Sequence, residues 1–195
     1  GPDAAARKAK EESGKDISVD DCKKLMARLE HKYPNLVAYF NSCRSRVRND
    51  MWMCNCFGRY RRFKPTTDRQ ALGESERQGL NYNMQSTVAD AVSRALDYMY
   101  HYRETHSDID YKIILQIHDA ILLEVPFEHA GRVWSEVIPE CMVSRVPIYP
   151  CHLNGKPTGK GPYYLGAGRD AYLRWGEELK KEDCIKLGLP EFLGN

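Results

Sequence analysis

Apolar residues recur every three or four positions between Glu74 and Arg103, and this pattern constrains the fold more than any other feature. The recurring positions are Leu80, Met84, Val88, Val92, Leu96 and Met99. A repeat of about 3.6 residues is the period of an α-helix that buries one stripe of its surface. The sequence therefore predicts one long helix over residues 74–103.

Two short β-branched runs follow this helix, at residues 113–117 and 121–125. Such runs favour strands, and almost no loop separates them, so they predict a tight antiparallel hairpin. His118 and Asp119 lie at its tip, between two strands that we expect to be buried. An aspartate in this place either caps the turn through a hydrogen bond or faces a cleft. The residues alone leave both alternatives open.

Further helices are predicted on both sides of these elements. Ser18 begins a capping sequence ahead of a first helix, and Pro34 suits the first turn of a second helix that ends near Asp50. Residues 127–143 carry a third amphipathic pattern, which Pro139 interrupts.

The remaining segments predict extended or irregular structure. Residues 51–63 are rich in aromatic residues and cysteine, with Gly58 as the expected turn, and they predict a short hairpin or extended arm. From Val146 the chain is rich in Pro, Gly and Tyr, and we expect irregular structure until a final segment around residues 169–181. Together the patterns predict an α+β fold in which an antiparallel β-hairpin packs against several amphipathic helices.

Residues 1–17 are predicted to lie outside the fold. Gly1-Pro2 resembles the scar of a protease cleavage, and the residues after it are rich in Ala, Lys and Glu with nothing to bury. We therefore divide the chain into a tag remnant and disordered lead at 1–17, a main region at 18–146, and a divergent C-terminal extension packed on that region at 147–195.

Basic residues are concentrated near the predicted arm. With 29 Lys and Arg against 27 Asp and Glu, the formal net charge is only +2, so affinity for nucleic acid would come from a local patch. Arg59, Arg61, Arg62 and Lys64 are interleaved with aromatic residues and would form a patch that binds phosphate groups. A solvated basic loop is the alternative.

The cysteine pattern indicates a reducing compartment. The chain has 7 cysteines without a Cys-x-x-Cys pair, and it opens with no signal peptide. A zinc site built from Cys54 and Cys56 with His152 or His129 is a weaker alternative, because a single Cys-x-Cys lacks a second pair. No apolar run reaches the roughly 18 residues of a membrane span. We expect a soluble cytoplasmic protein that is not secreted and binds no membrane.

One polar series lies on the predicted long helix. Arg77, Asn81 and Gln85 are four residues apart, so they would project from nearly one face, beside the apolar stripe. These side chains could bind a ligand or be ordinary solvated residues, and their spacing alone does not decide between the two alternatives.

Two segments resemble the C-terminal palm of family A DNA polymerases, the bacterial DNA polymerase I group. They read ERQGLNYNMQSTVAD at residues 76–90 and LQIHD at residues 115–119. Upstream, Tyr33-Pro34 opens a helix as in that family, and FGRYRR at residues 57–62 is similar to its aromatic-Gly-Arg-Arg arm. The resemblance covers residues 20–150. Beyond it, Trp175 near a closing helix is similar to the end of the family.

The resemblance implies a role for each matching residue of the helix and the hairpin tip. Arg77, Asn81 and Gln85 would contact the minor groove and backbone of primer-template DNA near its growing end. His118 would support the primer terminus, and Asp119 would bind catalytic Mg²⁺. Hydrogen-bond acceptors are present in the minor groove of every base pair, so donors placed there check pair shape without reading sequence.

The resemblance also implies what surrounds these residues in a complete enzyme. Arg59, Arg61 and Arg62 would bind the DNA, and deoxynucleoside triphosphates would be the second substrate. Two Mg²⁺ ions about 3.5 to 4 Å apart activate the primer hydroxyl and stabilise the departing pyrophosphate. The second carboxylate and the nucleotide-binding helix of the family lie upstream. The resemblance therefore implies an N-terminal polymerase portion or subunit, in a bacterium or a phage-infected cell, and the chain alone is expected not to polymerise.

Two other interpretations remain. Position 120 is Ala, whereas the family usually has Glu after the His-Asp pair, so the chain could be a catalytically inactive palm-derived module that binds DNA or a replication partner. A weaker alternative is an unrelated α+β protein in which Asp119 only caps a turn.

Overall fold

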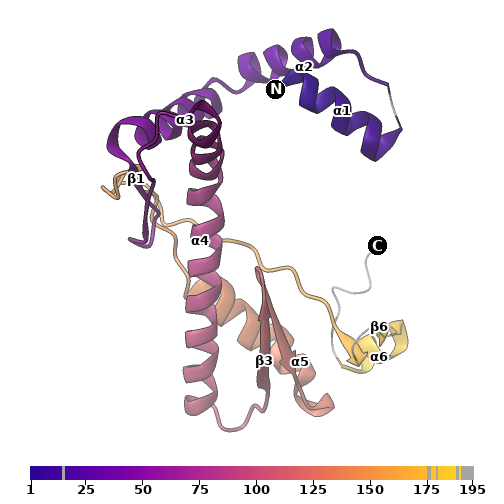
Figure 1. The fold of residues 1–195 in the computed structure, drawn as a ribbon. Coiled ribbons are helices and arrows are strands. Elements are labelled where there is room, and N and C mark those ends of the chain that lie inside the picture. The colour runs from indigo at the N-terminus through magenta and orange to yellow at the C-terminus, as the bar shows by residue number, and fades with distance from the viewer. Residues whose placement is uncertain (15, 175–176, 179, 188, 190–195) are drawn as a thin grey trace. The chain divides into compact units, whose positions relative to one another are not determined.

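The computed structural model describes the chain except residues 15, 175–176, 179, 188 and 190–195. The described residues form two compact units, one made of 1–51 with 63–80 and one made of 52–62 with 81–195. Helix α4 (Arg69–Thr105) belongs to both ranges (Figure 1). Trp175, singled out above, lies outside the described residues.

The first unit is helical, and its helices begin where the sequence places them. Helix α2 (Val19–Lys32) follows Ser18, whose side chain accepts a hydrogen bond of 3.1 Å from the backbone N–H of Asp21. Pro34 is the first residue of α3 (Pro34–Ser45), which continues into a π-helical turn at Arg46–Asp50. The prediction of these two helices is confirmed.

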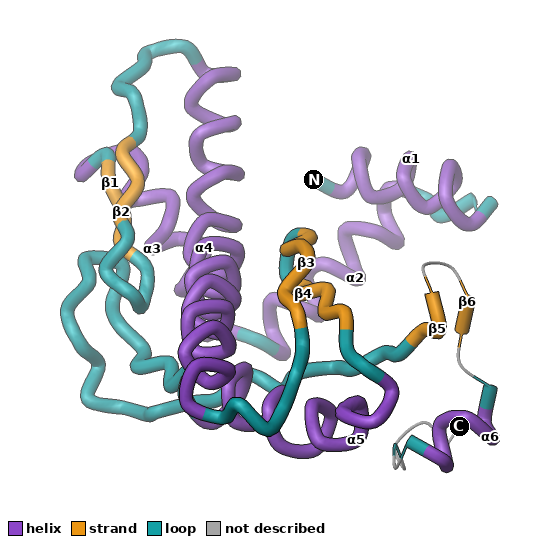
Figure 2. Tube along the Cα trace, turned by 90° about the horizontal axis from the view of Figure 1, so that it is seen from below, coloured by secondary structure: helices purple, strands orange, loops and turns teal. Residues whose placement is uncertain are grey.

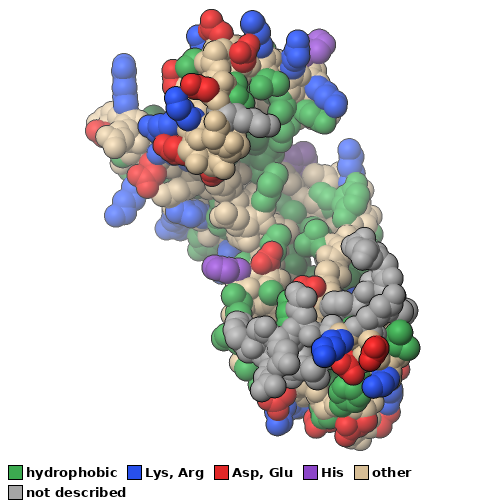
Figure 3. All heavy atoms as spheres, turned by 90° about the vertical axis from the view of Figure 1, so that its right-hand side faces the viewer, with side chains coloured by type: hydrophobic (Ala, Val, Ile, Leu, Met, Phe, Trp, Pro, Cys, Tyr) green, Lys and Arg blue, Asp and Glu red, His purple; other side chains and the backbone are tan. Residues whose placement is uncertain are grey.

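Within the segment expected to be a tag remnant and disordered lead, residues 2–13 form helix α1 (Pro2–Ser13). Ala, Lys and Glu are strong helix formers, and exposed ion pairs at i,i+4 spacing, Arg7 with Glu11 and Lys8 with Glu12, support the helix. No residue of α1 is buried. Acidic and basic side chains are interspersed over α1 and α2 in Figure 3.

The predicted long helix exists, and it is longer than residues 74–103. Its most buried positions are Tyr82, Asp90, Ala91, Val92, Ala95, Met99 and Tyr102. Met84, assigned to the buried stripe, is exposed. The stripe therefore keeps the predicted Val92 and Met99, and it also includes Tyr82, Ala91, Ala95 and Tyr102. None of the described helices is long and apolar enough to cross a membrane.

Two antiparallel hairpins belong to the second unit, and both were predicted. Strands β1 (Trp52–Cys54) and β2 (Tyr60–Arg62) form the arm, with Gly58 at φ +86° in its turn. Strands β3 (Lys112–Ile117) and β4 (Ala120–Glu124) pair from Ile117 opposite Ala120. A third small hairpin is formed by β5 (Tyr172–Arg174) and β6 (Glu177–Glu178).

The core of the second unit lies between α4, the β3–β4 hairpin and the helical stretch after it. That stretch contains a 3₁₀ turn (Phe127–His129), helix α5 (Ala130–Arg132) and π-helical segments at Val133–Val137 and Pro139–Ser144. Its buried centre is made of Met99, Tyr102, Ile109, Tyr111, Val133, Val137 and Cys141. Ile113, Ile121 and Leu123 pack onto this centre from the hairpin, which lies beside α4 in Figures 1 and 2. A short helix, α6 (Lys181–Lys186), follows β6.

The expectation that both hairpin strands are buried is wrong. On β3, Ile114, Leu115 and Ile117 are exposed, although Ile113 is partly buried. The hairpin has only two strands within the described residues, so the helices cover one face and leave the rest of β3 open. The α+β fold class is confirmed.

Candidate nucleic-acid interface

Asn55 anchors the turn of the β1–β2 arm to helix α4. Its side chain is almost completely buried, with 1% of the residue exposed. The Asn55 Oδ1 atom accepts hydrogen bonds of 3.0 Å from the backbone N–H groups of Phe57 and Arg59. Its Nδ2 atom donates to the Ser86 Oγ at 3.0 Å and to the Asp90 Oδ2 at 2.7 Å. One amide therefore holds both the shape of the turn and its place on the helix.

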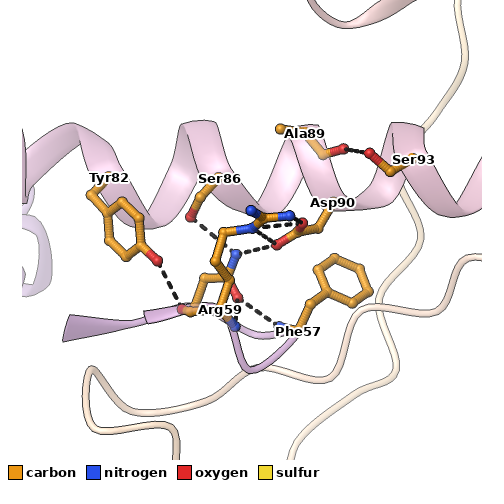
Figure 4. Close-up of polar contacts among 8 residues, drawn as sticks. Phe57, Arg59, Tyr82, Ser86, Ala89, Asp90 and Ser93 are labelled. Atoms are coloured by element: carbon orange, nitrogen blue, oxygen red, sulfur yellow. Dashed lines mark hydrogen bonds and ion pairs between the residues drawn. The ribbon is translucent and has the colours of Figure 1, made fainter. Parts of the chain in front are cut away.

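Arg59 makes the second link, an ion pair with Asp90 (Figure 4). The Arg59 Nε donates to both carboxylate oxygens of Asp90 at 2.9 and 3.0 Å, and its Nη2 donates as well. The Tyr82 hydroxyl donates to the carbonyl oxygen of Arg59 at 2.8 Å. The Arg59 side chain stays 61% exposed while that of Asp90 is 10% exposed. Arg59, expected to bind DNA, thus lies in the arm with its guanidinium engaged by α4.

Burial of Asp90 disfavours its charged form, but hydrogen bonds from Arg59 and Asn55 outweigh this effect and hold the pKa of the Asp90 carboxyl below its ordinary value of 3.8. A carboxyl with a lowered pKa in the folded state contributes stability above the unfolded pKa, and this contribution is lost as the pH falls through the folded pKa.

We expect the difference in unfolding free energy between the wild type and Asp90→Asn to shrink as the pH falls from 7 to below 3.8, because the wild-type carboxylate then becomes protonated. Urea titrations of both proteins at several pH values measure it, and the subtraction cancels the other carboxyl groups. The exposed Asp110→Asn variant is the control. A difference that stays constant with pH would contradict the assigned pKa.

The polar series of the long helix lies next to the anchor. The anchoring residues Tyr82, Ser86 and Asp90 repeat every four positions along α4, and Asn81 and Gln85 precede two of them by one position. One residue turns an α-helix by about 100°, so the series forms the neighbouring stripe. Its members, Arg77, Asn81 and Gln85, are all exposed on α4. Their amide and guanidinium groups are therefore accessible to a ligand.

The arm presents an exposed basic and aromatic strand. Arg61 and Arg62 are both exposed on β2, and Tyr60 is 62% exposed. The guanidinium carbon of Arg62 lies 5.7 Å from the centre of the Tyr60 ring, a distance typical of cation–π contacts. The strand thus carries positive charge on a short element that α4 holds in place.

His118 lies at the first position of the two-residue tip with φ +54°. This left-handed conformation costs a non-glycine residue roughly 1–2 kcal/mol, although His, Asn and Asp adopt it more often than others. The Gln116 Nε2 donates to the His118 carbonyl oxygen at 3.2 Å. The pairing of Ile117 with Ala120 on either side fixes the tip.

Asp119 completes the tip and is exposed. In the described part of the chain its carboxylate makes no hydrogen bond that would cap the turn, so the turn-capping alternative has no support in the structure. The described residues also contain no group of three or more His, Cys, Asp or Glu side chains arranged to hold a metal ion. Mg²⁺ binds proteins through one or two carboxylates and keeps several waters. Asp119 therefore fits as one ligand of Mg²⁺ and does not make a complete site.

The zinc alternative gains no geometric support either. Cys54 and Cys151 lie near Cys56, and burial together with the neighbouring thiols raises the pKa of the Cys151 thiol to about 12. No metal-holding group that includes these cysteines is found among the described residues.

Sequence reasoning missed the anchor of the arm. Asn55 was not singled out, and Asp90 entered only as part of a longer motif. The spacing of Tyr82, Ser86 and Asp90 was a usable signal, because residues four apart share a helix face. The role of Asn55 could not be predicted from the sequence, because its hydrogen-bond partners on the arm and on α4 come together only in the folded chain.

Comparisons with known proteins give the relatives of this chain. The sequence profile of the family described as DNA polymerase family A matches residues 6–153. DNA polymerase I of Caldicellulosiruptor bescii is 27% identical over 134 residues, which cover 68% of this chain and 16% of the relative. DNA polymerase I of Pseudomonas aeruginosa is 29% identical over 111 residues, which cover 55% of this chain and 12% of the relative. The chain thus spans only a small part of these relatives.

A solved structure has a similar fold. The POL domain of Pol1 from M. smegmatis, in complex with DNA primer-template and dNTP, matches with a TM-score of 0.63 and 23% identity, covering 72% of this chain and 24% of that one. At this identity the likeness shows the fold. The family match begins inside the predicted lead, at residue 6, and covers most of the chain. With its fold and most of its sequence matched, the chain belongs to DNA polymerase family A.

Proposed function

We propose that the chain is the C-terminal palm part of a DNA-directed DNA polymerase. The observation that carries this proposal is the exposed His118-Asp119 tip, held on a two-residue turn of a hairpin that packs against α4 in a family A chain. Its partners are primer-template DNA and deoxynucleoside triphosphates. The second carboxylate and the nucleotide-binding helix come from an N-terminal polymerase portion or subunit, so the isolated chain does not extend a primer.

The exposed stripe of α4 holds the DNA in this proposal. Arg77, Asn81 and Gln85 donate hydrogen bonds to minor-groove acceptors and to the backbone near the primer terminus. The minor groove offers hydrogen-bond acceptors at every base pair, so the affinity of this stripe for DNA does not depend on the DNA sequence. Arg61 and Arg62 of the arm neutralise phosphate charge, while Arg59 and Asp90 keep the arm on α4.

The hairpin tip positions the reacting groups. The ring of His118 supports the primer terminus, and Asp119 supplies one carboxylate to Mg²⁺. When bound, Mg²⁺ stabilises the charge that develops during nucleotidyl transfer. A tip fixed by strand pairing on both sides suits this role, because ligands of a catalytic ion must keep their positions.

Duplex binding tests the role of the stripe. We expect the Asn81→Ala and Gln85→Ala variants each to weaken binding of a primer-template by about fivefold to tenfold, since each loses one hydrogen bond. Arg77→Ala should also lower the slope of log affinity against log salt by about 0.9 where it contacts a phosphate. Fluorescence anisotropy with duplexes of several sequences measures both effects.

The control for Arg77→Ala is Arg28→Ala on α2, another exposed arginine whose loss changes the net charge by the same amount. Its affinity should stay close to that of the wild type. The proposed minor-groove contacts would be contradicted if the three stripe variants bound the duplex with unchanged affinity, or if their loss of affinity depended strongly on the duplex sequence.

A second function is favoured by Ala120, the residue after the His-Asp pair. An inactive palm-derived module would hold DNA or a replication partner without chemistry. It would need the stripe and the arm but not Asp119. Asp119→Ala would then leave the biological function intact, whereas the polymerase proposal requires that this variant abolish synthesis.

A further inference from the structure

Residues 147–165, called here the tail segment, contain a second concentration of exposed aromatic and basic side chains. Tyr149 and Tyr163 are each 57% exposed, and Tyr164 is 51% exposed. Lys156 and Lys160 are exposed as well. Tyrosine rings usually bury much of their apolar surface, so three exposed rings in one short segment indicate a surface that binds a ligand.

The tail segment is held in a defined conformation by its own backbone. Ile148 and Tyr163 exchange two backbone hydrogen bonds of 2.8 and 2.9 Å. The Thr158 Oγ1 donates to the Pro150 carbonyl oxygen at 2.9 Å. This pairing brings the backbone at residue 149 close to that at residues 163 and 164, which lie more than ten positions further along the chain. The backbone that carries the three tyrosines is therefore ordered before any ligand binds, which lowers the entropy cost of binding.

The tip of the tail segment packs directly on the arm. The Cys54 N–H of β1 donates to the Leu153 carbonyl oxygen at 2.9 Å. A Cβ atom at Gly155 would lie 3.1 Å from the Cys54 Sγ. Figure 1 shows this segment, in orange, beside β1. Tyr60 is the partner of Cys54 on β2, so the aromatic groups of the arm and of the tail segment belong to adjoining elements.

The charge of both elements suits a polyanion. No Asp or Glu occurs from Met51 to Thr67 or from Val146 to Gly168. The arm and the tail segment therefore present Arg and Lys without acidic neighbours in their own sequence, in a chain whose net charge is only +2. Basic side chains combined with exposed aromatic rings are typical of surfaces on which unpaired bases stack.

We propose that the tail segment and the arm together bind the unpaired strand of a primer-template, with Tyr149, Tyr163 and Tyr164 stacking on bases and Lys156 and Lys160 contacting phosphates. Single-stranded DNA is the occupant that fits, because bases inside a duplex do not expose their faces for stacking. Tyr163 and Tyr164 lie beyond residue 153, where the family match ends. The proposal rests on the proposed function in that it takes the strand to be the template extension.

The test uses the full chain with three fluorescent probes: a blunt duplex, the same duplex with an unpaired 5′ extension, and a single-stranded oligonucleotide. We expect the extended duplex to bind at least tenfold more tightly than the blunt one. The triple variant Tyr149→Ala, Tyr163→Ala, Tyr164→Ala should lose this preference, since each stacked base contributes about fivefold or more, while binding of the blunt duplex stays unchanged.

Three comparisons make the result specific to stacking. The triple Phe variant of the same positions keeps the rings and should keep the preference. Tyr100→Ala removes an exposed tyrosine from α4 and should have no effect. Replacing both Lys156 and Lys160 with Gln should lower the salt slope for the single strand by about 1.4, or about 0.7 for each phosphate that a lysine no longer neutralises.

Two results would overturn the inference. Equal affinity of the wild type for the blunt and the extended duplex is one, and a preference that survives in the triple Ala variant is the other. If the blunt duplex binds in either case, the proposed palm function stands and only the role of the tail segment fails. If the chain binds none of the three probes, both proposals fail.

Discussion

Replacing Asp119 with asparagine is expected, under the proposed function, to reduce primer extension by about a thousandfold or more in a polymerase that contains this segment as one chain or as two subunits. Asparagine keeps the shape of the side chain and one oxygen atom but removes the charge that Mg²⁺ requires. Stabilisation of transition-state charge by a metal contributes several kcal/mol, and each 1.36 kcal/mol is a factor of about ten in rate. Single-turnover extension of a labelled primer measures the effect.

The same preparation separates chemistry from binding. Asp119→Asn should bind primer-template as tightly as the wild type, because the stripe on α4 and the arm are unchanged. Asp110→Asn, an exposed aspartate that precedes β3, is the matched control and should extend normally. Extension at the wild-type rate by Asp119→Asn would refute the catalytic assignment of Asp119.

Replacing Asn55 with alanine is expected to destabilise the fold by about 3 kcal/mol. The variant leaves the backbone N–H groups of Phe57 and Arg59 without their acceptor and takes one donor from the Asp90 carboxylate. Buried polar groups without partners cost about 1–3 kcal/mol each, but solvent reaching the exposed arm offsets part of this. For a chain of this size the shift corresponds to about 6–12 °C in Tm.

Thermal unfolding followed by circular dichroism gives the Tm values. Asn35→Ala, at an exposed position of α3, is the control and should melt close to the wild type. Asn55→Asp should be no better than Asn55→Ala, because it places a second carboxylate beside Asp90. A Tm loss for Asn55→Ala as small as that of the control would show that the arm does not depend on this amide.

The sequence predicted the elements that depend on local chemistry. Ser18 and Pro34 mark helix starts because capping and the fixed φ of proline act within one turn. The turns at Gly58 and at His118-Asp119 were also located, since the β-branched runs around the second leave only three residues between them. The likeness to the polymerase palm likewise followed from short motifs in order.

What could not be predicted depends on contacts between distant residues. Asp90 is buried against Asn55 and Arg59 of the arm, which donate hydrogen bonds to its carboxylate. The residues next to each of them in the sequence do not indicate these contacts. Met84 is exposed although it follows the apolar period, while the small Ala91 and Ala95 are buried against other parts of the chain. The exposure of β3 was missed because a β-branched run has the same composition whether one face or both are covered.

The uncovered strand β3 affects how the chain behaves in solution. Among the described residues β3 pairs with β4 alone, and a strand that presents apolar side chains such as Ile114 and Leu115 beside such an open edge is a template for further strands. We therefore expect such an edge to favour self-association of the chain. A lysine introduced on the open edge of β3 should reduce this self-association, because a charged side chain disfavours the addition of another strand.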